Sequence, residues 1–247
     1  MMKKIVAIIG SPKGKQSISY NVVDRLFEEI KNLYNEIEIN IILLSECNIG
    51  MCKGCTTCFM KCTTCVQYDD DIKHIEDELL SADIVLFASP VYAHNLTGTM
   101  KNFIDRISYW LHILKLTGKY GVVVSVSNSN GNVFVDDYLS KMMEFMGISV
   151  IENIDYSNIK PLNKQDIISI AKKIEYYLIN DKVILNYELK NNVFQVYKKA
   201  YQDEYSKRIR DSHNKMTNEI LYWKNNRYFE CNNFQELFDL ISGNSDI

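Results

Sequence analysis

The chain has 247 residues, which is enough for one large domain or for one domain with an extension. Hydrophobic residues make up 47% and charged residues 24%, as in ordinary globular proteins, and the net charge of −3 argues against a nucleic-acid partner. No apolar run reaches the roughly 20 residues of a membrane-spanning helix, and the start does not have the pattern of a signal peptide. We therefore expect a cytoplasmic protein that does not bind membranes.

The first apolar stretch, Ile5 to Ile9, has the β-branched composition of a buried parallel strand. A short turn with hydroxyl and basic residues follows, and helical periodicity begins at Ser17. Free N–H groups and the helix dipole favour a phosphate at such a helix N-terminus. We expect Ser11, Ser17 and Ser19 to donate to the phosphate oxygens and Lys13 or Lys15 to offset its charge, with Ile18, between the two serines, also in contact. A plain strand–turn–helix connection capped by Ser17 would give the same pattern.

The rest of the first 180 residues alternates between strands and helices. Strands are expected at 38–44, 84–88, 120–126 and 148–154, and helices at 22–33, 69–81, 98–116, 133–146 and 165–179. This alternation predicts the α/β class, with a doubly wound parallel sheet and helices on both faces. Five strands fit the flavodoxin-like order 2-1-3-4-5, which binds ligands at the carboxyl ends of its strands. The loops after strands one, three and four should therefore converge.

A run of closely spaced cysteines lies between the second strand and the next helix. Six of the seven cysteines fall between Cys47 and Cys65, in the spacing Cys52-x2-Cys55-x2-Cys58-x3-Cys62-x2-Cys65. A compact run of this kind can turn several thiolates toward an iron–sulfur cluster. Structural zinc sites usually pair two Cys-x-x-Cys elements across a longer insert. Zinc and redox or merely structural thiols remain as alternatives.

Three segments in the same order resemble the flavodoxin-like NAD(P)H-dependent FMN reductases. They are Gly10-Ser11-Pro12-Lys13 with Ser17-Ile18-Ser19, then the cysteine run, then Ser89-Pro90-Val91-Tyr92. The cysteine run is most similar to that of the iron-sulfur flavoproteins within this family. The resemblance covers about the first three quarters of the chain. It implies FMN as the cofactor and NAD(P)H as a transient donor.

The resemblance also implies which residues hold the cofactors. The flavin ring would lie along Pro90, Val91, Tyr92, Ala93, His94 and Asn95, with Ser127, Asn128 and Gly131 as a third wall. Tyr92 and His94 would be nearest the ring, and no residue is assigned a strictly catalytic role. A four-iron cluster would be held by Cys52, Cys55, Cys58 and Cys65, because Cys65 precedes a pair of aspartates as the family's last cysteine does. Cys62 is the alternative fourth ligand. Without the resemblance, Pro90 would merely end a strand and Tyr92 would be a core residue.

In residues 181–247 the alternation of strands and helices no longer continues. We therefore expect a flavodoxin-like domain at 1–180 followed by a helical extension at 181–247. Aromatic residues at helical spacing between Val193 and Tyr205, and again near Trp223, predict helices that pack on the main domain or on a second subunit. A homodimer or homotetramer is expected from the resemblance.

The resulting prediction is an FMN-dependent oxidoreductase that passes electrons between a small-molecule or protein donor and an acceptor. Without a cluster, reduction of quinones or nitro compounds would be expected instead. An alternative of another class is a metal-binding sensor that uses the fold only to present its cysteines.

Overall fold

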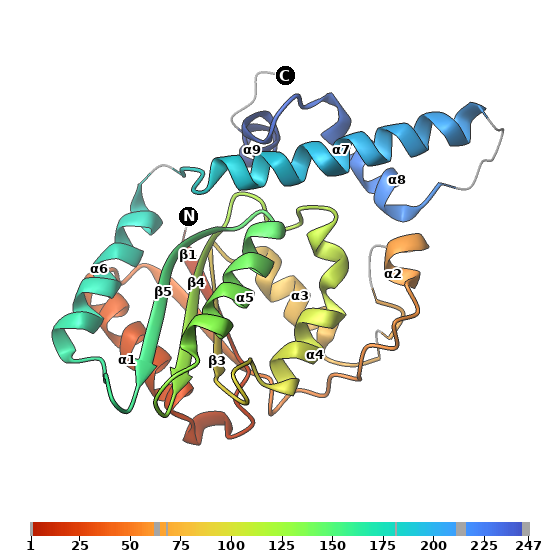
Figure 1. Cartoon of the computed structure of the whole chain (residues 1–247). Helices are drawn as coiled ribbons and strands as arrows, with labels where there is room; N and C mark the ends of the chain where they lie inside the picture. The colour runs from red at the N-terminus through yellow and green to blue at the C-terminus, as the bar shows by residue number, and fades with distance from the viewer. Residues whose placement is uncertain (1, 62–64, 68, 181, 211–215, 244–247) are drawn as a thin grey trace.

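The computed structural model of the chain describes residues 2–61, 65–67, 69–180, 182–210 and 216–243. Within these residues one parallel sheet has the strand order β2-β1-β3-β4-β5. The strands are β1 (Lys3–Ile9), β2 (Ile37–Leu43), β3 (Ile84–Pro90), β4 (Tyr120–Ser127) and β5 (Ser149–Ser157). The predicted flavodoxin-like order is confirmed, and Figure 1 shows the carboxyl ends of the strands at one edge of the sheet.

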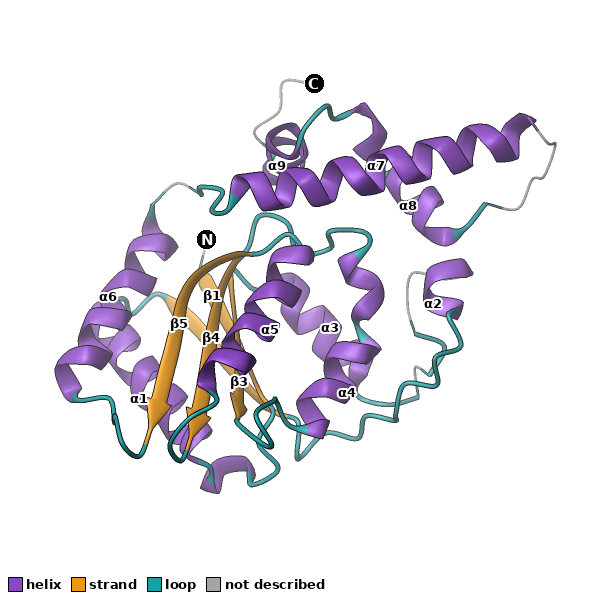
Figure 2. Ribbon diagram, in the orientation of Figure 1, coloured by secondary structure: helices purple, strands orange, loops and turns teal. Residues whose placement is uncertain are grey.

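Helices cover both faces of the sheet, as Figure 2 shows. One face is covered by α1 (Ile18–Leu33) and α6 (Lys164–Ile179), and the other by α3 (Ile72–Ser81), α4 (Gly98–Arg106) and α5 (Asn132–Phe145). The central strands β3 and β4 are buried on both faces, which explains why they read as continuous apolar runs. The alternation predicted from sequence is therefore confirmed.

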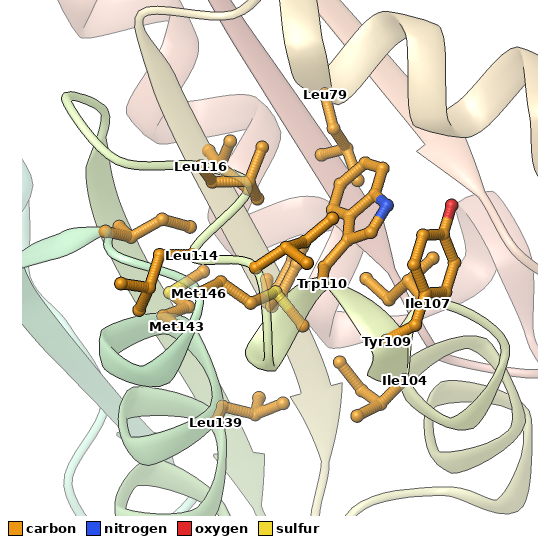
Figure 3. Close-up of a cluster of buried hydrophobic side chains, with 14 of the residues drawn as sticks. Leu79, Ile104, Ile107, Tyr109, Trp110, Leu114, Leu116, Leu139, Met143 and Met146 are labelled. Atoms are coloured by element: carbon orange, nitrogen blue, oxygen red, sulfur yellow. The ribbon is translucent and has the colours of Figure 1, made fainter. Parts of the chain in front are cut away.

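The single helix predicted at 98–116 is wrong in its second half. The α-helix ends at Arg106, and a 3-10 turn at Ser108–Leu111 follows a bend at Ile107. Leu114 then has a positive φ of 47°. Figure 3 shows the reason, since side chains throughout this segment, Tyr109 and Trp110 among them, point into one buried cluster. Ser108, His112 and Lys115 recur at helical spacing in the sequence, so the local pattern predicts a continuous helix and does not reveal the bends.

The helix predicted to begin at 69 begins at Ile72. The acidic residues before it are used elsewhere, because Asp71 accepts a hydrogen bond from the backbone N–H of Asn48. Asp70 accepts from the N–H of Gly50 and pairs with Arg106. The acidic stretch therefore ties down the cysteine segment and does not extend the helix.

The C-terminal extension is helical, as predicted, with α7 (Tyr187–Arg210), α8 (Asn218–Asn225) and α9 (Phe234–Ser242). Its buried aromatic residues Phe194, Trp223 and Phe234 join the core on the face covered by α3, α4 and α5. Lys190 forms a buried ion pair with Glu144 of α5. The boundary at 180/181 stays a prediction. None of the described helices combines the length and the apolar character that crossing a membrane requires.

Candidate functional site

A cavity of about 290 Å³, here called the edge cavity, lies at the carboxyl edge of the sheet. Its walls come from the loops after β1, β3, β4 and β5. The lining residues are Ser11, Lys13, Gln16, Ser17, Ile18, Ser19, Pro90, Val91, Tyr92, Val126, Ser127, Asn128 and Asn158. The predicted convergence of the first three loops is confirmed.

The first loop delivers the chain to the N-terminus of α1. Ser17 is the N-cap, since its hydroxyl accepts from the Tyr20 N–H at 3.1 Å and donates to the Gly14 carbonyl at 2.7 Å. Two other hydroxyls of the edge cavity, on Ser19 and Ser127, are buried without a hydrogen-bond partner among the described residues. Buried hydroxyls without partners cost free energy, so a ligand with several acceptor oxygens would satisfy them. Together with the free N–H groups of the helix, they fit a phosphate.

The second loop is a tight hairpin after β3. The N–H of Tyr92 donates to the Asn95 carbonyl at 2.7 Å, and the N–H of Asn95 donates to the Tyr92 carbonyl at 2.9 Å. Ala93 and His94 between them have positive φ angles of 49° and 59°. Turns of this kind favour asparagine or glycine, so an alanine there is strained. The hairpin therefore holds Pro90, Val91 and Tyr92 against the edge cavity at some energetic cost.

Four of the predicted flavin contacts do not line the edge cavity: Ala93, His94, Asn95 and Gly131. The His94 ring packs against Phe134 of α5, with ring centroids 5.4 Å apart. Gly131 has a φ of 92°, and a Cβ there would lie 2.8 Å from Val91 Cγ1. These residues join the second loop to the third, and their contact with a flavin stays a prediction.

Three lining residues were not predicted, namely Gln16, Val126 and Asn158. Asn158 follows β5 directly, so the rule that strand ends share one edge would have found it. Its side-chain amide donates to Asn128 Oδ1 at 2.8 Å, which links the fourth loop to the third.

One buried carboxyl group, that of Asp136, lies close to the exposed Asp155 near the third and fourth loops. Asn132, the first residue of α5, donates to the carbonyls of Ser125 and Tyr156 and so ties β4 to β5. Ser125 donates to Asp155, and Asp136 is buried one turn further along α5. Burial, followed by the interaction with Asp155, raises the pKa of Asp136 to about 8. Asp136 therefore holds a proton at neutral pH.

The cysteines line a second, smaller cavity of about 160 Å³, here called the cysteine cavity. Cys52, Cys55, Cys58 and Cys65 are among its lining residues. Cys62, the alternative fourth ligand, lies outside the described residues. Among the described residues no three His, Cys, Asp or Glu side chains already converge as a ligand set. The donor set still has the chemistry of an iron–sulfur site, because four thiols share one cavity.

Two thiols of this cavity differ in their acidity. Burial, with a contribution from Cys65, raises the pKa of Cys58 to about 11. Hydrogen bonding from Thr57 lowers the pKa of the exposed Cys55.

The cysteine segment contains little regular structure apart from α2 (Thr57–Met60), and side chains of α4 hold it in place. Asn102 accepts from the Cys52 N–H at 3.1 Å and donates to the carbonyls of Ile49 and Gly50 at 3.3 Å. Arg106, one turn later, donates to the Gly50 carbonyl at 2.7 Å and pairs with Asp70. These two α4 side chains, here called the α4 clamp, were not predicted from the sequence.

The charge pair of the α4 clamp is buried. The side chain of Arg106 is fully buried and that of Asp70 is 9% exposed. Burial acts to raise the pKa of Asp70, but hydrogen bonds from Arg106 and from backbone N–H groups outweigh it and lower the pKa. Both groups are therefore charged at neutral pH.

An open parallel sheet with the strand order 2-1-3-4-5 and a cavity at its carboxyl edge defines a flavodoxin-like protein. The model of one family within this class, described as NADPH-dependent FMN reductase, matches residues 3–158, and the chain belongs to that family. The resemblance noted in the sequence is thereby confirmed.

Named relatives support the same assignment. An iron-sulfur flavoprotein of Archaeoglobus fulgidus is 36% identical over 148 residues, which are 59% of this chain and 64% of the relative. An iron-sulfur flavoprotein of Clostridioides difficile is 28% identical over 183 residues, or 72% of this chain and 80% of the relative. The chain thus spans just under two thirds of the first relative and four fifths of the second. An FMN-dependent NADH-azoreductase from Bacillus anthracis, solved in complex with FMN, shares the fold with a TM-score of 0.51 at 18% identity, over 72% of this chain and 98% of that one.

Proposed function

We propose that the chain is an FMN-dependent NAD(P)H oxidoreductase that binds FMN in the edge cavity. The observation that carries this proposal is the pair of buried, unpartnered hydroxyls of Ser19 and Ser127 beside the N-terminus of α1. Bound FMN would supply the hydride and single-electron chemistry. The protein's part is to bind the phosphate with the 11–19 turn and to orient the ring along 90–95 and 127–131. No side chain is required as a nucleophile, and Tyr92 and His94 are the side chains proposed nearest the ring.

The test is an FMN titration of protein stripped of flavin, followed by NADH and NADPH oxidation. One FMN per chain with quenched flavin fluorescence, and turnover with either nicotinamide, would support the proposal. A chain that binds no FMN at millimolar excess would overturn it.

We further propose that the cysteine cavity holds a four-iron cluster on Cys52, Cys55, Cys58 and Cys65. Two observations support it: these four cysteines are among the lining residues of one cavity, and the relatives from Archaeoglobus and Clostridioides are named iron-sulfur flavoproteins. Anaerobically purified protein should contain about four iron atoms per chain and show a brown absorption shoulder that dithionite bleaches. Cys55→Ala should remove the shoulder and leave the flavin, and retention of both would refute the cluster.

A second candidate function is a cluster-free quinone or nitro reductase. It is favoured by the lack of a converged ligand set among the described residues. A relative named FMN-dependent NADH:quinone oxidoreductase, from Stenotrophomonas maltophilia, is 27% identical over 114 residues. Iron-free protein that still reduces quinones with NADH would select this function. Colourless, zinc-loaded protein would instead favour the metal-binding sensor.

The proposed assembly is a homodimer or homotetramer in which a second subunit covers the mouth of the edge cavity. Its support is the group of exposed apolar side chains there, on Tyr92, Val133 and Phe134. Light scattering with and without FMN tests the proposal, and a monomer under both conditions would refute it. The cytoplasmic location stays a prediction.

A further inference from the structure

The guanidinium of Arg106 has one N–H group that the fold does not use. An arginine carries five N–H donors. Nη1 donates to the Gly50 carbonyl and to Asp70 Oδ2, and Nη2 donates to the Gln67 carbonyl and to Asp70 Oδ1. The remaining donor, Nε–H, is buried and has no hydrogen-bond partner among the described residues. A buried donor without an acceptor is uncommon and calls for an explanation.

The cysteine cavity offers the acceptor. Arg106 lines this cavity together with Cys65, whose side chain is buried and lies close enough to interact with the guanidinium. A protonated thiol is a weak acceptor, whereas a metal-bound thiolate is a strong one. The Nε–H group is therefore placed for a partner that exists only when Cys65 is a ligand.

We propose that Arg106 is a positioning residue of the cluster site, whose Nε–H donates a hydrogen bond to the Cys65 thiolate and raises the reduction potential of the cluster. This inference rests on the proposed cluster. It also assigns the fourth ligand to Cys65, because the α4 clamp fixes Arg106 beside this sulfur atom.

The hydrogen bond, and not the net charge, is the expected source of the effect. Asp70 balances the charge of Arg106 at close range, so the pair adds almost no net charge to the site. Hydrogen bonds to the cluster sulfurs stabilise the reduced, more negative state and so raise the potential. A donor from a charged group is roughly twice as strong as a neutral one.

The first experiment is redox titration of the cluster, followed by electron paramagnetic resonance of the reduced form. Arg106→Lys keeps the charge but removes Nε–H, and it should shift the equilibrium about tenfold toward the oxidised cluster, which is about 59 mV for one electron. The matched control is Lys101→Gln, which removes a charge at the exposed, Cys52 side of the same helix. It should change the equilibrium by less than about twofold, because solvent screens that charge.

A double-mutant cycle separates a direct contact from a structural effect. Cys65→Ser should shift the potential, and Arg106→Lys added to it should shift it little further, because the same interaction is already lost. Cys62→Ser should leave the potential unchanged. If Arg106→Lys loses its iron while retaining FMN, its potential cannot be measured. Cys65→Ser and Cys62→Ser then decide alone whether the sulfur atom beside Arg106 is the fourth ligand.

The outcomes distinguish the two proposals. Wild-type protein without iron would overturn the cluster itself. A wild-type cluster whose potential is the same in Arg106→Lys, or is shifted by Cys62→Ser and not by Cys65→Ser, would overturn only the role of Arg106.

Discussion

The edge cavity and the cysteine cavity are built in different ways. Backbone loops that leave neighbouring parallel strands form the edge cavity, and Asp136 of α5, which follows the third loop, is buried and holds a proton at neutral pH. The cysteine cavity is formed by a segment with almost no regular structure, and the α4 clamp holds it through a buried ion pair. The topology of the sheet thus creates the first site, whereas two long-range side chains create the second. Substitutions should therefore disturb the two sites separately.

The largest difference between the effects on the two cavities is expected from Asp70→Asn. This change leaves the buried Arg106 charge without its carboxylate and should lower the free energy of unfolding by about 3–5 kcal/mol. The loss should concentrate in the cysteine segment, because Asp70 binds both ends of it. Hydrogen exchange of residues 47–70, with iron and FMN content, measures this. Iron should fall while FMN binding persists.

The control for Asp70→Asn is Asp77→Asn, which makes the same substitution in the exposed pair between Lys73 and Asp77. Exposed pairs of this spacing contribute about 0.3–0.5 kcal/mol. If the two variants lose similar stability, the α4 clamp does not hold the cysteine segment.

Asp136→Asn tests the buried carboxyl group of α5 through the pH dependence of the free energy of unfolding. The folded chain holds a proton on Asp136 up to about pH 8, whereas an unfolded aspartate releases it near pH 4. Between these values the folded state binds more protons, so the wild type loses stability as pH rises, by at most about 1.4 kcal/mol per pH unit. Asparagine removes this slope. The free energy of unfolding of the variant should therefore rise relative to that of the wild type between pH 5 and pH 8.

Urea unfolding at pH 5, 6.5 and 8 measures this difference. Asp137→Asn, at the neighbouring exposed position, should retain the wild-type slope. Equal slopes in wild type and Asp136→Asn would mean that Asp136 does not hold a proton at neutral pH.

These two sites also show what a sequence can predict. Apolar runs and the rule for strand ends predicted the sheet order and most of the edge cavity, because both depend on local patterns. Asn102 and Arg106 could not be predicted, since their partners lie some 36 to 56 residues away and no local pattern marks the pairing. The bend after Arg106 was missed because Ser108, His112 and Lys115 keep a helical spacing through residues 107–116. The α4 clamp and that bend are consequences of tertiary packing alone.

Within the edge cavity, Ser19→Ala separates ligand binding from folding. The Ser19 hydroxyl has no described partner, so its removal should not lower the stability of the ligand-free chain. It should weaken FMN binding about tenfold, the equivalent of one hydrogen bond to a charged group. Ser17→Ala is the matched control, because loss of the N-cap should lower the free energy of unfolding by about 1 kcal/mol. Unchanged FMN affinity in Ser19→Ala would place the phosphate elsewhere.

The smallest effect is expected from Ala93→Gly, which tests whether strain in the hairpin serves the site. At a φ of 49°, glycine relieves a steric cost that alanine bears, so stability should rise by about 0.5–1 kcal/mol despite the greater freedom of glycine when unfolded. If the strain holds Pro90, Val91 and Tyr92 in place for the flavin, the same variant should bind FMN more weakly. Gly98, at the start of α4, offers a contrast, because Gly98→Ala adds a methyl group in open space and should leave FMN affinity unchanged. A loss of stability in Ala93→Gly would show that the turn is not strained, and the edge cavity would then owe its shape to the strands alone.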